Sequence, residues 1–152
     1  MGFFFTLMRV LGRFRVVRRG PAGHVAMYRL TNGRLGGHFG AAPVLLLTTV
    51  GRKSGKRRTT PVLYLPDGER YVLVAGGRGV VLPFWYLNLR RNPQARIQVG
   101  DRRLDVRAET VGPQEREELW RRLVAMFPAY ETHERESGKQ FPVVALTPSV
   151  PV

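Results

Sequence analysis

Residues 44–65 read VLLLTTVGRKSGKRRTTPVLYL, and this stretch decides the fold. Val44–Val50 is a short apolar run of β type, which predicts a buried strand. Gly51–Arg58 is polar and holds two glycines, so we expect a turn there, followed by a second strand over Thr59–Leu65. Two strands joined by a short turn pair antiparallel, and the hairpin therefore predicts an antiparallel sheet.

The rest of the chain continues this pattern of strands and turns. Further strands are expected over Arg70–Ala75, Arg96–Val99, Arg102–Thr110 and Pro142–Thr147, and helices over Pro21–Asn32, Pro83–Leu89, Pro113–Phe127 and Pro128–Glu136. A sheet that buries aliphatic side chains on both faces tends to close on itself. The predicted fold class is α+β, mainly β: a small barrel of about six mostly antiparallel strands with flanking helices. We expect residues 41–150 to form this barrel and residues 1–40 to form an N-terminal helical segment.

Charge is distributed unevenly along the chain. The 152 residues include 25 Lys and Arg, 11 Asp and Glu and no Cys, so the formal net charge is +14. No acidic residue precedes Asp67, whereas Met1–Arg58 holds 12 of the cations. This asymmetry indicates an anionic partner, either a membrane surface, a nucleic acid or a small polyanion. The absence of Cys excludes a disulfide framework, a thiolate-ligated metal and a cysteine nucleophile.

The first 19 residues predict an amphipathic helix. One stripe at helical spacing holds Phe3, Leu7, Val10, Leu11, Phe14 and Val17. The segment is too short and too charged to span a bilayer, which needs about 20 mostly apolar residues, and its arginines follow its apolar residues, unlike those of a secretory leader. Such a helix either lies in the plane of an anionic membrane interface or packs on the domain or a neighbouring subunit. We therefore expect a cytoplasmic protein, with peripheral contact to the inner face of the plasma membrane as one alternative.

The turn Gly51–Arg58 carries the sharpest chemical signal. Five of its eight residues are cationic, and its glycines permit backbone amides to point together, a combination suited to phosphate or carboxylate groups. Its spacing is one residue short of a Walker A loop, arginine follows Lys56 where that loop has Ser or Thr, and a strand follows instead of a helix. These differences argue against nucleoside triphosphate hydrolysis. They leave an anion-binding turn or an exposed basic hairpin without a ligand.

A second glycine-rich segment, Gly76–Gly79, precedes the aromatic pair Trp85 and Tyr86. Its glycines either let a ligand approach the backbone or simply connect two elements, and the aromatic rings either border a ligand or pack in the core. The three histidines lack metal-ligand spacing and no serine lies in a nucleophile elbow, so neither a metal site nor a serine hydrolase is expected. A phosphate-type turn without a nucleophile, metal or acid pair indicates chemistry that a bound cofactor carries.

Together these residues resemble a known family. The chain is similar to the deazaflavin-dependent nitroreductases in two motifs and their surroundings. The first is LLTTVGRKSG at residues 46–55, followed by Arg57 or Arg58 and by Pro61, and the second is WYLNL at residues 85–89, followed by Asn92-Pro93. The resemblance covers roughly Val44–Pro148 and includes Leu119-Trp120, Leu123, Met126-Phe127-Pro128, Tyr130 and Pro142-Val143-Val144. Members are actinobacterial split β-barrel oxidoreductases that use coenzyme F420, a deazaflavin with a phosphate and an oligoglutamate tail. The resemblance thus implies a split β-barrel and a polyanionic cofactor.

The resemblance also implies roles for matched positions. The basic turn would hold the phosphate and tail of F420, and the glycine-rich segment and the Trp-Tyr helix would border the ring. The cofactor-binding residues expected on this basis are Arg52, Lys53, Ser54, Gly55, Lys56, Arg57, Arg58, Pro61, Ala75, Gly76, Gly77, Trp85 and Tyr86. Tyr130 and His133 are the expected proton donors. The chain departs from the family pattern in the segment before the Trp-Tyr helix, where Gly76–Gly79 replaces a more polar run and Leu82 replaces a polar residue. It also has Phe127 and His133 where the nitroimidazole-reducing member of the family carries tyrosines.

By this resemblance, reduced F420 would deliver hydride to an electron-poor, lipophilic acceptor such as a quinone, an enone or a nitroaromatic compound, with the protein supplying orientation and a proton. The alternatives are a split-barrel oxidoreductase that binds FMN, and a non-catalytic protein that binds F420 or lipid. Nucleic acid is disfavoured because the aromatic residues lie among glycines and prolines, away from most of the arginines. Split barrels of this kind often form dimers, so a homodimer is a further expectation.

Overall fold

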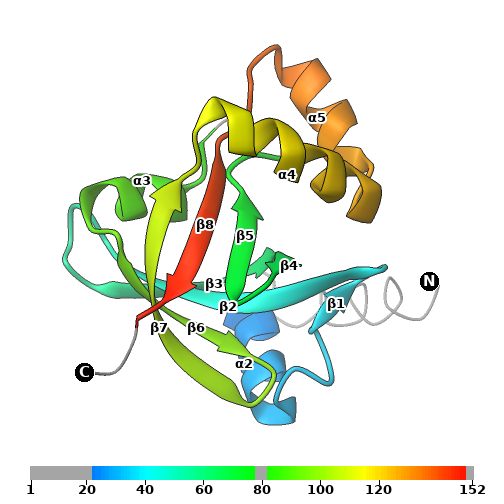
Figure 1. Cartoon of the computed structure of the whole chain (residues 1–152). Coiled ribbons are helices and arrows are strands. Elements are labelled where there is room, and N and C mark those ends of the chain that lie inside the picture. Colours follow the sequence, from blue (N-terminus) through cyan, green and yellow to red (C-terminus); the bar gives the residue numbers. More distant parts are fainter. Residues whose placement is uncertain (1–21, 78–81, 150–152) are drawn as a thin grey trace.

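The computed structural model describes residues 22–77 and 82–149 (Figure 1). The amphipathic helix expected over residues 1–19 lies outside the described residues, as do Arg78 and Gly79. The described helices are α2 (Ala22–Thr31), α3 (Phe84–Arg91), α4 (Pro113–Met126) and α5 (Ala129–Ser137). The strands are β1 (His38–Phe39), β2 (Ala42–Val50), β3 (Arg57–Leu63), β4 (Leu65–Asp67), β5 (Arg70–Val74), β6 (Gln94–Val99), β7 (Arg102–Thr110) and β8 (Val143–Pro148).

The strands and helices expected between residues 22 and 149 all occur, although several of their ends differ. Two strands are additional, and one shift bears on the site. The additions are the short strands β1 and β4; a two-residue strand has no periodicity to detect, and the Pro66-Asp67-Gly68 run is typical of a turn. The shift concerns Arg57 and Arg58, which were expected in the turn but begin β3. The turn ends at Lys56 because Gly55 takes the left-handed conformation, with φ of 70°, one residue earlier.

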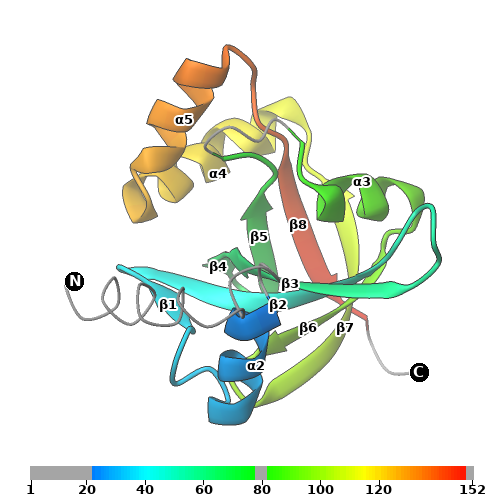
Figure 2. The ribbon, with the colours of Figure 1, turned by 180° about the vertical axis from the view of Figure 1, so that it is seen from behind.

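The strands form one eight-stranded antiparallel sheet in the order β1-β2-β6-β7-β8-β5-β4, with β3 paired to β2 off this path. In the predicted β2–β3 hairpin, the paired residues run from Val44 opposite Leu63 to Val50 opposite Arg57. Figure 2 shows this long hairpin lying across the direction of β5 and β8, so the sheet curls into a half-barrel. Strand twist makes such curling the ordinary behaviour of a large sheet.

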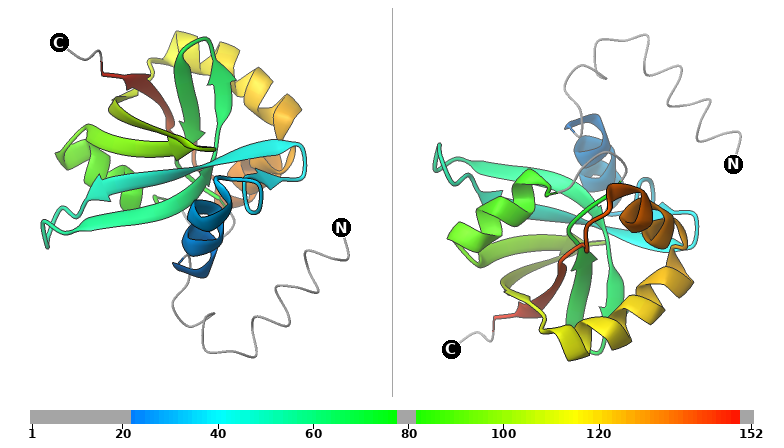
Figure 3. Two further views of the ribbon diagram at one scale, coloured as in Figure 1. Left: turned by 90° about the horizontal axis from the view of Figure 1, so that it is seen from below. Right: turned by 90° about the horizontal axis from the view of Figure 1, so that it is seen from above.

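Alternation along β2 divides its apolar side chains between two layers. Leu45 and Leu47 are fully buried in the barrel interior, in a cluster that also holds Leu73, Ala75, Tyr86, Leu89, Ile97, Val106, Val144 and Leu146. Val44 and Leu46 face the other way and pack on Val25 and Tyr28 of α2, which lies beside the hairpin in Figure 3. The Tyr28 hydroxyl accepts a hydrogen bond from the Gly100 amide at 2.8 Å, which fastens α2 to the β6–β7 turn.

Helices α4 and α5 cover the other end of the barrel (Figure 1). Leu119 and Leu123 of α4 and Tyr130 of α5 are buried against Val72, Val74, Phe141 and Val143. An ion-pair network joins α4 to the β4–β5 hairpin. Asp67 of the hairpin accepts hydrogen bonds from Arg122 of α4, at 2.7 Å, and from Arg70. Arg70 also pairs with Glu115 of α4 at 2.7 Å. These contacts fix the position of α4 and α5 relative to β5 and to the segment that follows β5.

The described part of the N-terminal segment contributes to the barrel's outer layer. Strand β1 pairs with Ala42 and Pro43, so residue 40, the expected domain boundary, lies in the turn between β1 and β2. Within residues 22–77 and 82–149, no helix has the length and apolar character needed to cross a membrane.

Candidate functional site

The basic turn between β2 and β3 is closed by its own glycines. The Gly51 amide donates to the Lys56 carbonyl and the Gly55 amide donates to the Gly51 carbonyl, both at 2.8 Å. A Cβ on Gly51 would lie 2.7 Å from the Ser54 hydroxyl oxygen and 3.1 Å from the Lys56 carbonyl oxygen, so a larger residue there would displace the Ser54 side chain and crowd the turn. The two glycines therefore shape the turn, and their amides are used inside it.

The tip of this turn presents unused donors. The amides of Lys53 and Ser54 have no hydrogen-bond partner among the described residues, whereas the Ser54 hydroxyl accepts from the Lys56 amide at 3.2 Å. Lys53, Ser54 and Lys56 are exposed. Two successive amides surrounded by cations form the kind of concavity that binds anions.

Asn88 of α3 holds the turn in place. The residue is 3% exposed. Its Oδ1 accepts hydrogen bonds from the Arg52 amide at 3.1 Å and from Arg52 Nη1 at 3.3 Å. Its Nδ2 donates to the Thr49 hydroxyl at 3.0 Å. The Arg52 guanidinium also lies 5.6 Å from the centre of the Phe84 ring, at the start of the same helix. Asn88 was not among the expected site residues, although it is the one side-chain amide in the run WYLNL.

Strand β3 separates the last two cations of the predicted cluster. Arg58 pairs with Thr49, whose hydroxyl contacts Asn88, and so shares the face that α3 covers. Arg57 and Pro61 lie on the opposite face, where Pro61 pairs with Leu46 of the layer beneath α2. The structure therefore groups Arg52, Lys53, Lys56 and Arg58 around the turn and places Arg57 and Pro61 elsewhere.

The segment after β5 is held by β8 and the residues before it. Ala75 is fully buried and its amide donates to the Pro142 carbonyl at 2.8 Å. A Cβ on Gly76 would lie 2.4 Å from the Phe141 ring, so this glycine is required by core packing. Gly77 has no described atom within 4 Å of a Cβ position. Of these three residues, only Gly77 leaves open space beside the backbone.

The two aromatic residues of α3 differ in exposure. Tyr86 is 7% exposed, lies in the interior cluster and has its hydroxyl 3.5 Å from the Thr110 hydroxyl. Trp85 is half-buried against the same cluster, with its ring edge-to-face on Tyr86. Tyr86 is thus a core residue, while part of Trp85 remains accessible to a ligand.

The expected proton donors both lie on α5, and Tyr130 belongs to the buried cluster beneath α4. Tyr130 is 6% exposed and packs edge-to-face on Phe127, with ring centres 4.9 Å apart. Burial raises the pKa of Tyr130 far above its usual value, so its hydroxyl stays protonated. His133 is half-buried one turn further along the helix. Phe141 belongs to the same cluster as Tyr130 and contacts Gly76, so α5 and the Gly76–Gly77 segment adjoin through this ring.

Comparisons with known proteins identify a family. The family model described as F420H(2)-dependent quinone reductase matches residues 22–148. An F420H(2)-dependent quinone reductase of Mycobacterium tuberculosis is 41% identical over 130 residues, covering 82% of this chain and 87% of that protein. Two solved structures are also similar. An F420-H2 dependent reductase, FDR-A, has a TM-score of 0.63 and 34% identity over 68% of this chain and 93% of its own. A protein solved as a domain-swapped dimer has a TM-score of 0.65 and 32% sequence identity, and the match covers 80% of this chain and 92% of that one.

Proposed function

Because the chain belongs to the F420H(2)-dependent quinone reductase family, we propose that it reduces a lipophilic quinone with hydride from reduced F420. The family resemblance drawn from the sequence is confirmed, and with it the split β-barrel fold, an oxidoreductase function and F420 as the cofactor. The acceptor and the residues that serve it are the proposal.

One observation carries this proposal: the turn that Asn88 fastens to α3 presents cations and unused amides together. F420 brings a phosphate and an acidic tail, and Arg52, Lys53, Lys56 and Arg58 are the residues that would hold them. Arginine forks bind phosphate bidentately, lysine adds mobile charge, and the Lys53 and Ser54 amides supply short donors. The described residues therefore fit a polyanionic cofactor.

The ring of the cofactor would border the segment between β5 and α3. Gly77 lacks a side chain and has open space beside it, so the backbone there admits a flat ring closely. The accessible part of Trp85 would cover the ring and exclude water from it. When bound, the deazaflavin supplies the hydride, and the protein supplies position and a proton.

Tyr130 is the proton-holding residue that we assign to the acceptor side. Its hydroxyl remains protonated at every physiological pH and can donate a hydrogen bond to a quinone oxygen. His133, one helical turn along α5, is the alternative donor. The same arrangement would serve an enone or a nitroaromatic compound as secondary acceptors, because both place partial negative charge on oxygen during reduction.

A lipophilic quinone resides in membranes, so we also propose peripheral membrane contact through residues 1–19. The amphipathic pattern of that segment supports this contact. Equal flotation of the full chain and of a chain lacking residues 1–19 on anionic liposomes would refute it. A homodimer is proposed on the related domain-swapped structure and is checked by light scattering.

The deciding experiment titrates the protein with F420 and with FMN while tryptophan fluorescence is recorded. We expect micromolar binding of F420, and oxidation of reduced F420 on addition of a menaquinone analogue. Binding of FMN without F420 would overturn the cofactor assignment for this chain. Binding of F420 with no oxidation by quinone, enone or nitroaromatic acceptors would instead indicate a cofactor carrier.

A further inference from the structure

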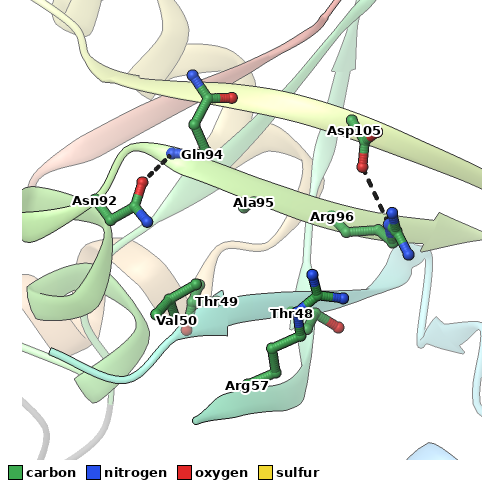
Figure 4. A pocket seen from close by; sticks show the side chains of 9 residues that line it. All are labelled: Thr48, Thr49, Val50, Arg57, Asn92, Gln94, Ala95, Arg96 and Asp105. Carbon is green, nitrogen blue, oxygen red and sulfur yellow. Dashed lines mark hydrogen bonds and ion pairs between the residues drawn. The ribbon is translucent and has the colours of Figure 1, made fainter. Parts of the chain in front are cut away.

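The outer face of the sheet carries a second cluster of cations, separate from the basic turn. A groove of about 370 Å³ opens there between α2, β3, β2, β6 and β7. It is lined by Arg29, Leu46, Thr48, Arg57, Thr59, Arg96, Ile97, Gln98 and Arg103. A smaller hollow of about 150 Å³ shares Thr48, Arg57 and Arg96 with it and extends toward the end of β2 (Figure 4).

Strand register brings these side chains together. Thr48 pairs with Thr59 on one side and with Arg96 on the other, so the three lie abreast on one face. Figure 4 shows Thr48 between Arg57 and Arg96, which come from strands on either side of β2. Arg103 pairs with Gln98 and extends the same face onto β7. The cluster is therefore a product of sheet pairing among residues up to 55 positions apart, from Thr48 to Arg103.

The threonine hydroxyls link this face to α2. The Thr48 and Thr59 hydroxyl oxygens lie 2.7 Å apart, and Arg29 Nη2 donates to Thr59 at 3.3 Å. Arg29, although exposed, thereby reaches from α2 to the edge of this face. The groove gains a fourth guanidinium and two hydroxyl groups that can reorient toward a ligand.

Among the residues that the structure describes, one of the four arginines of the groove is paired with a carboxylate. Asp105 pairs with Arg96 at 3.0 Å, and both side chains are more than half exposed. Arg29, Arg57 and Arg103 form no ion pair with any residue of the described ranges. The formal charge of the cluster is thus four minus one, or +3. Like charges gathered on one concave surface repel, and an anion bound between them removes that cost.

We propose that this outer groove is a binding site for an oxyanion of the phosphate class, carried by a soluble phosphate ester or by a lipid headgroup. Guanidinium forks and hydroxyl donors match phosphate oxygens, and the groove volume lies at the lower end of small-ligand sites. The site is separate from the one assigned to F420, because Arg58 and the face that α3 covers lie on the other side of the hairpin.

The test compares phosphate binding in two doubly substituted variants of equal charge. Arg96→Gln/Arg103→Gln removes two cations of the groove, whereas Arg121→Gln/Arg135→Gln removes two arginines that are 77% and 74% exposed on α4 and α5. Inorganic pyrophosphate is titrated by calorimetry, and binding to phosphatidylcholine vesicles with and without 30% phosphatidylglycerol is measured by co-sedimentation. Loss of groove binding by at least about tenfold is expected only in the first variant, since each charged hydrogen bond contributes about 1.5–3 kcal/mol.

Two further variants keep the result independent of folding. Asp105→Asn removes the carboxylate that pairs with Arg96 and should tighten binding several-fold, a gain that misfolding cannot produce. Lys53→Ala/Arg58→Ala removes cations of the basic turn and should leave this binding event in place. If Arg96→Gln/Arg103→Gln weakens the binding of pyrophosphate, the ligand is a soluble phosphate ester. If that variant weakens only the binding to anionic vesicles, the ligand is a lipid headgroup. Equal binding in both arginine variants, loss in Lys53→Ala/Arg58→Ala alone, or no binding of either probe would overturn the site.

Discussion

The backbone amide of Arg52 donates a hydrogen bond to Oδ1 of Asn88 at 3.1 Å, across 36 residues of sequence. This bond joins the basic turn to α3, the helix that also carries Trp85. The parts assigned to the phosphate and to the ring of F420 are thus positioned by one buried amide. A polyanion can be gripped only where its contacts are held in advance, and Asn88 provides that preorganisation.

Asn88→Ala is therefore expected to weaken F420 binding by at least about tenfold, because Arg52 and the turn lose their tether. It should also lower the free energy of unfolding by about 1–3 kcal/mol, since the Thr49 hydroxyl is left buried without its partner. Asn92→Ala is the control. It removes an amide at the end of the same helix, whose Oδ1 accepts from the nearby Gln94 amide, and should leave F420 affinity unchanged. Similar losses of affinity in both variants would show that Asn88 acts through helix stability alone.

Arg57 and Arg58 are adjacent in sequence but should differ in their effect on F420. Arg58→Ala is expected to weaken F420 binding about 10- to 150-fold, equivalent to a lost charged hydrogen bond of about 1.5–3 kcal/mol. Arg57→Ala, of equal charge, should change it less than about threefold because its side chain lies on the other face of β3. Fluorescence titration of the two variants decides the point, and a reversed order of affinities would contradict the assignment.

Gly76→Ala tests the close approach of the β5–α3 segment to Phe141. The added methyl group would collide with the ring, and overpacking of this kind costs about 1–3 kcal/mol. Gly77→Ala, beside open space, should cost less than about 0.5 kcal/mol. Phe141→Leu in the Gly76→Ala background should recover part of the loss. Urea unfolding measures all three, and equal stability of Gly76→Ala and the wild type would contradict the contact.

Tyr130→Phe keeps the packing of α5 and removes only the hydroxyl. We expect kcat with a menaquinone analogue to fall at least about tenfold while F420 affinity is retained, since a positioned proton donor contributes about 100-fold or more. A His133→Gln variant separates the two candidate donors. Unchanged kcat in Tyr130→Phe together with a loss in His133→Gln would move the role to His133.

The raised pKa of Tyr130 also predicts a loss of stability at high pH. The folded state keeps this phenol protonated, whereas the unfolded chain releases the proton near pH 10. The contribution is therefore complete below about pH 10 and is lost as the pH rises toward the folded-state pKa. Unfolding measured from pH 8 to pH 11.5 should show a shallower decline in Tyr130→Phe than in the wild type.

Asp67 predicts the opposite dependence at low pH. Hydrogen bonds from Arg122 and Arg70 hold the pKa of this carboxyl below its usual range. Its stabilising effect is thus present above about pH 4 and is lost as the pH falls through the lowered value. Asp67→Asn should cost about 1–2 kcal/mol at pH 7, given the partial exposure of the network, and should flatten the acid limb of the stability curve. If the free energy of unfolding fell equally at low pH in Asp67→Asn and in the wild type, the stabilising role of the ion pairs between α4 and the β4–β5 hairpin would be contradicted.

Much of the fold could be predicted because its signals are local. The apolar run at Val44–Val50 and the glycines on either side of Arg52-Lys53-Ser54 predict a hairpin without reference to the rest of the chain. Proline at the start of α4 and the acidic residues of its first turns predict a helix in the same way. Strand β1 was missed because two residues carry no period.

The sequence by itself determined the family, the antiparallel barrel and the chemistry of the turn, since spacing and residue type carry these. Only the tertiary structure decided which cations act together. Arg57 and Arg58 read as one cluster along the chain, yet strand alternation sends them to opposite faces of β3. Because β2 pairs with both β3 and β6, and β6 pairs with β7, Arg57 lines the same groove as Arg96 and Arg103. The roles of Asn88 and Gly76 likewise depend on partners 36 and 65 residues away. Contacts between such distant residues leave no periodic trace in the sequence, because they are set by how the sheet curls and not by neighbours along the chain.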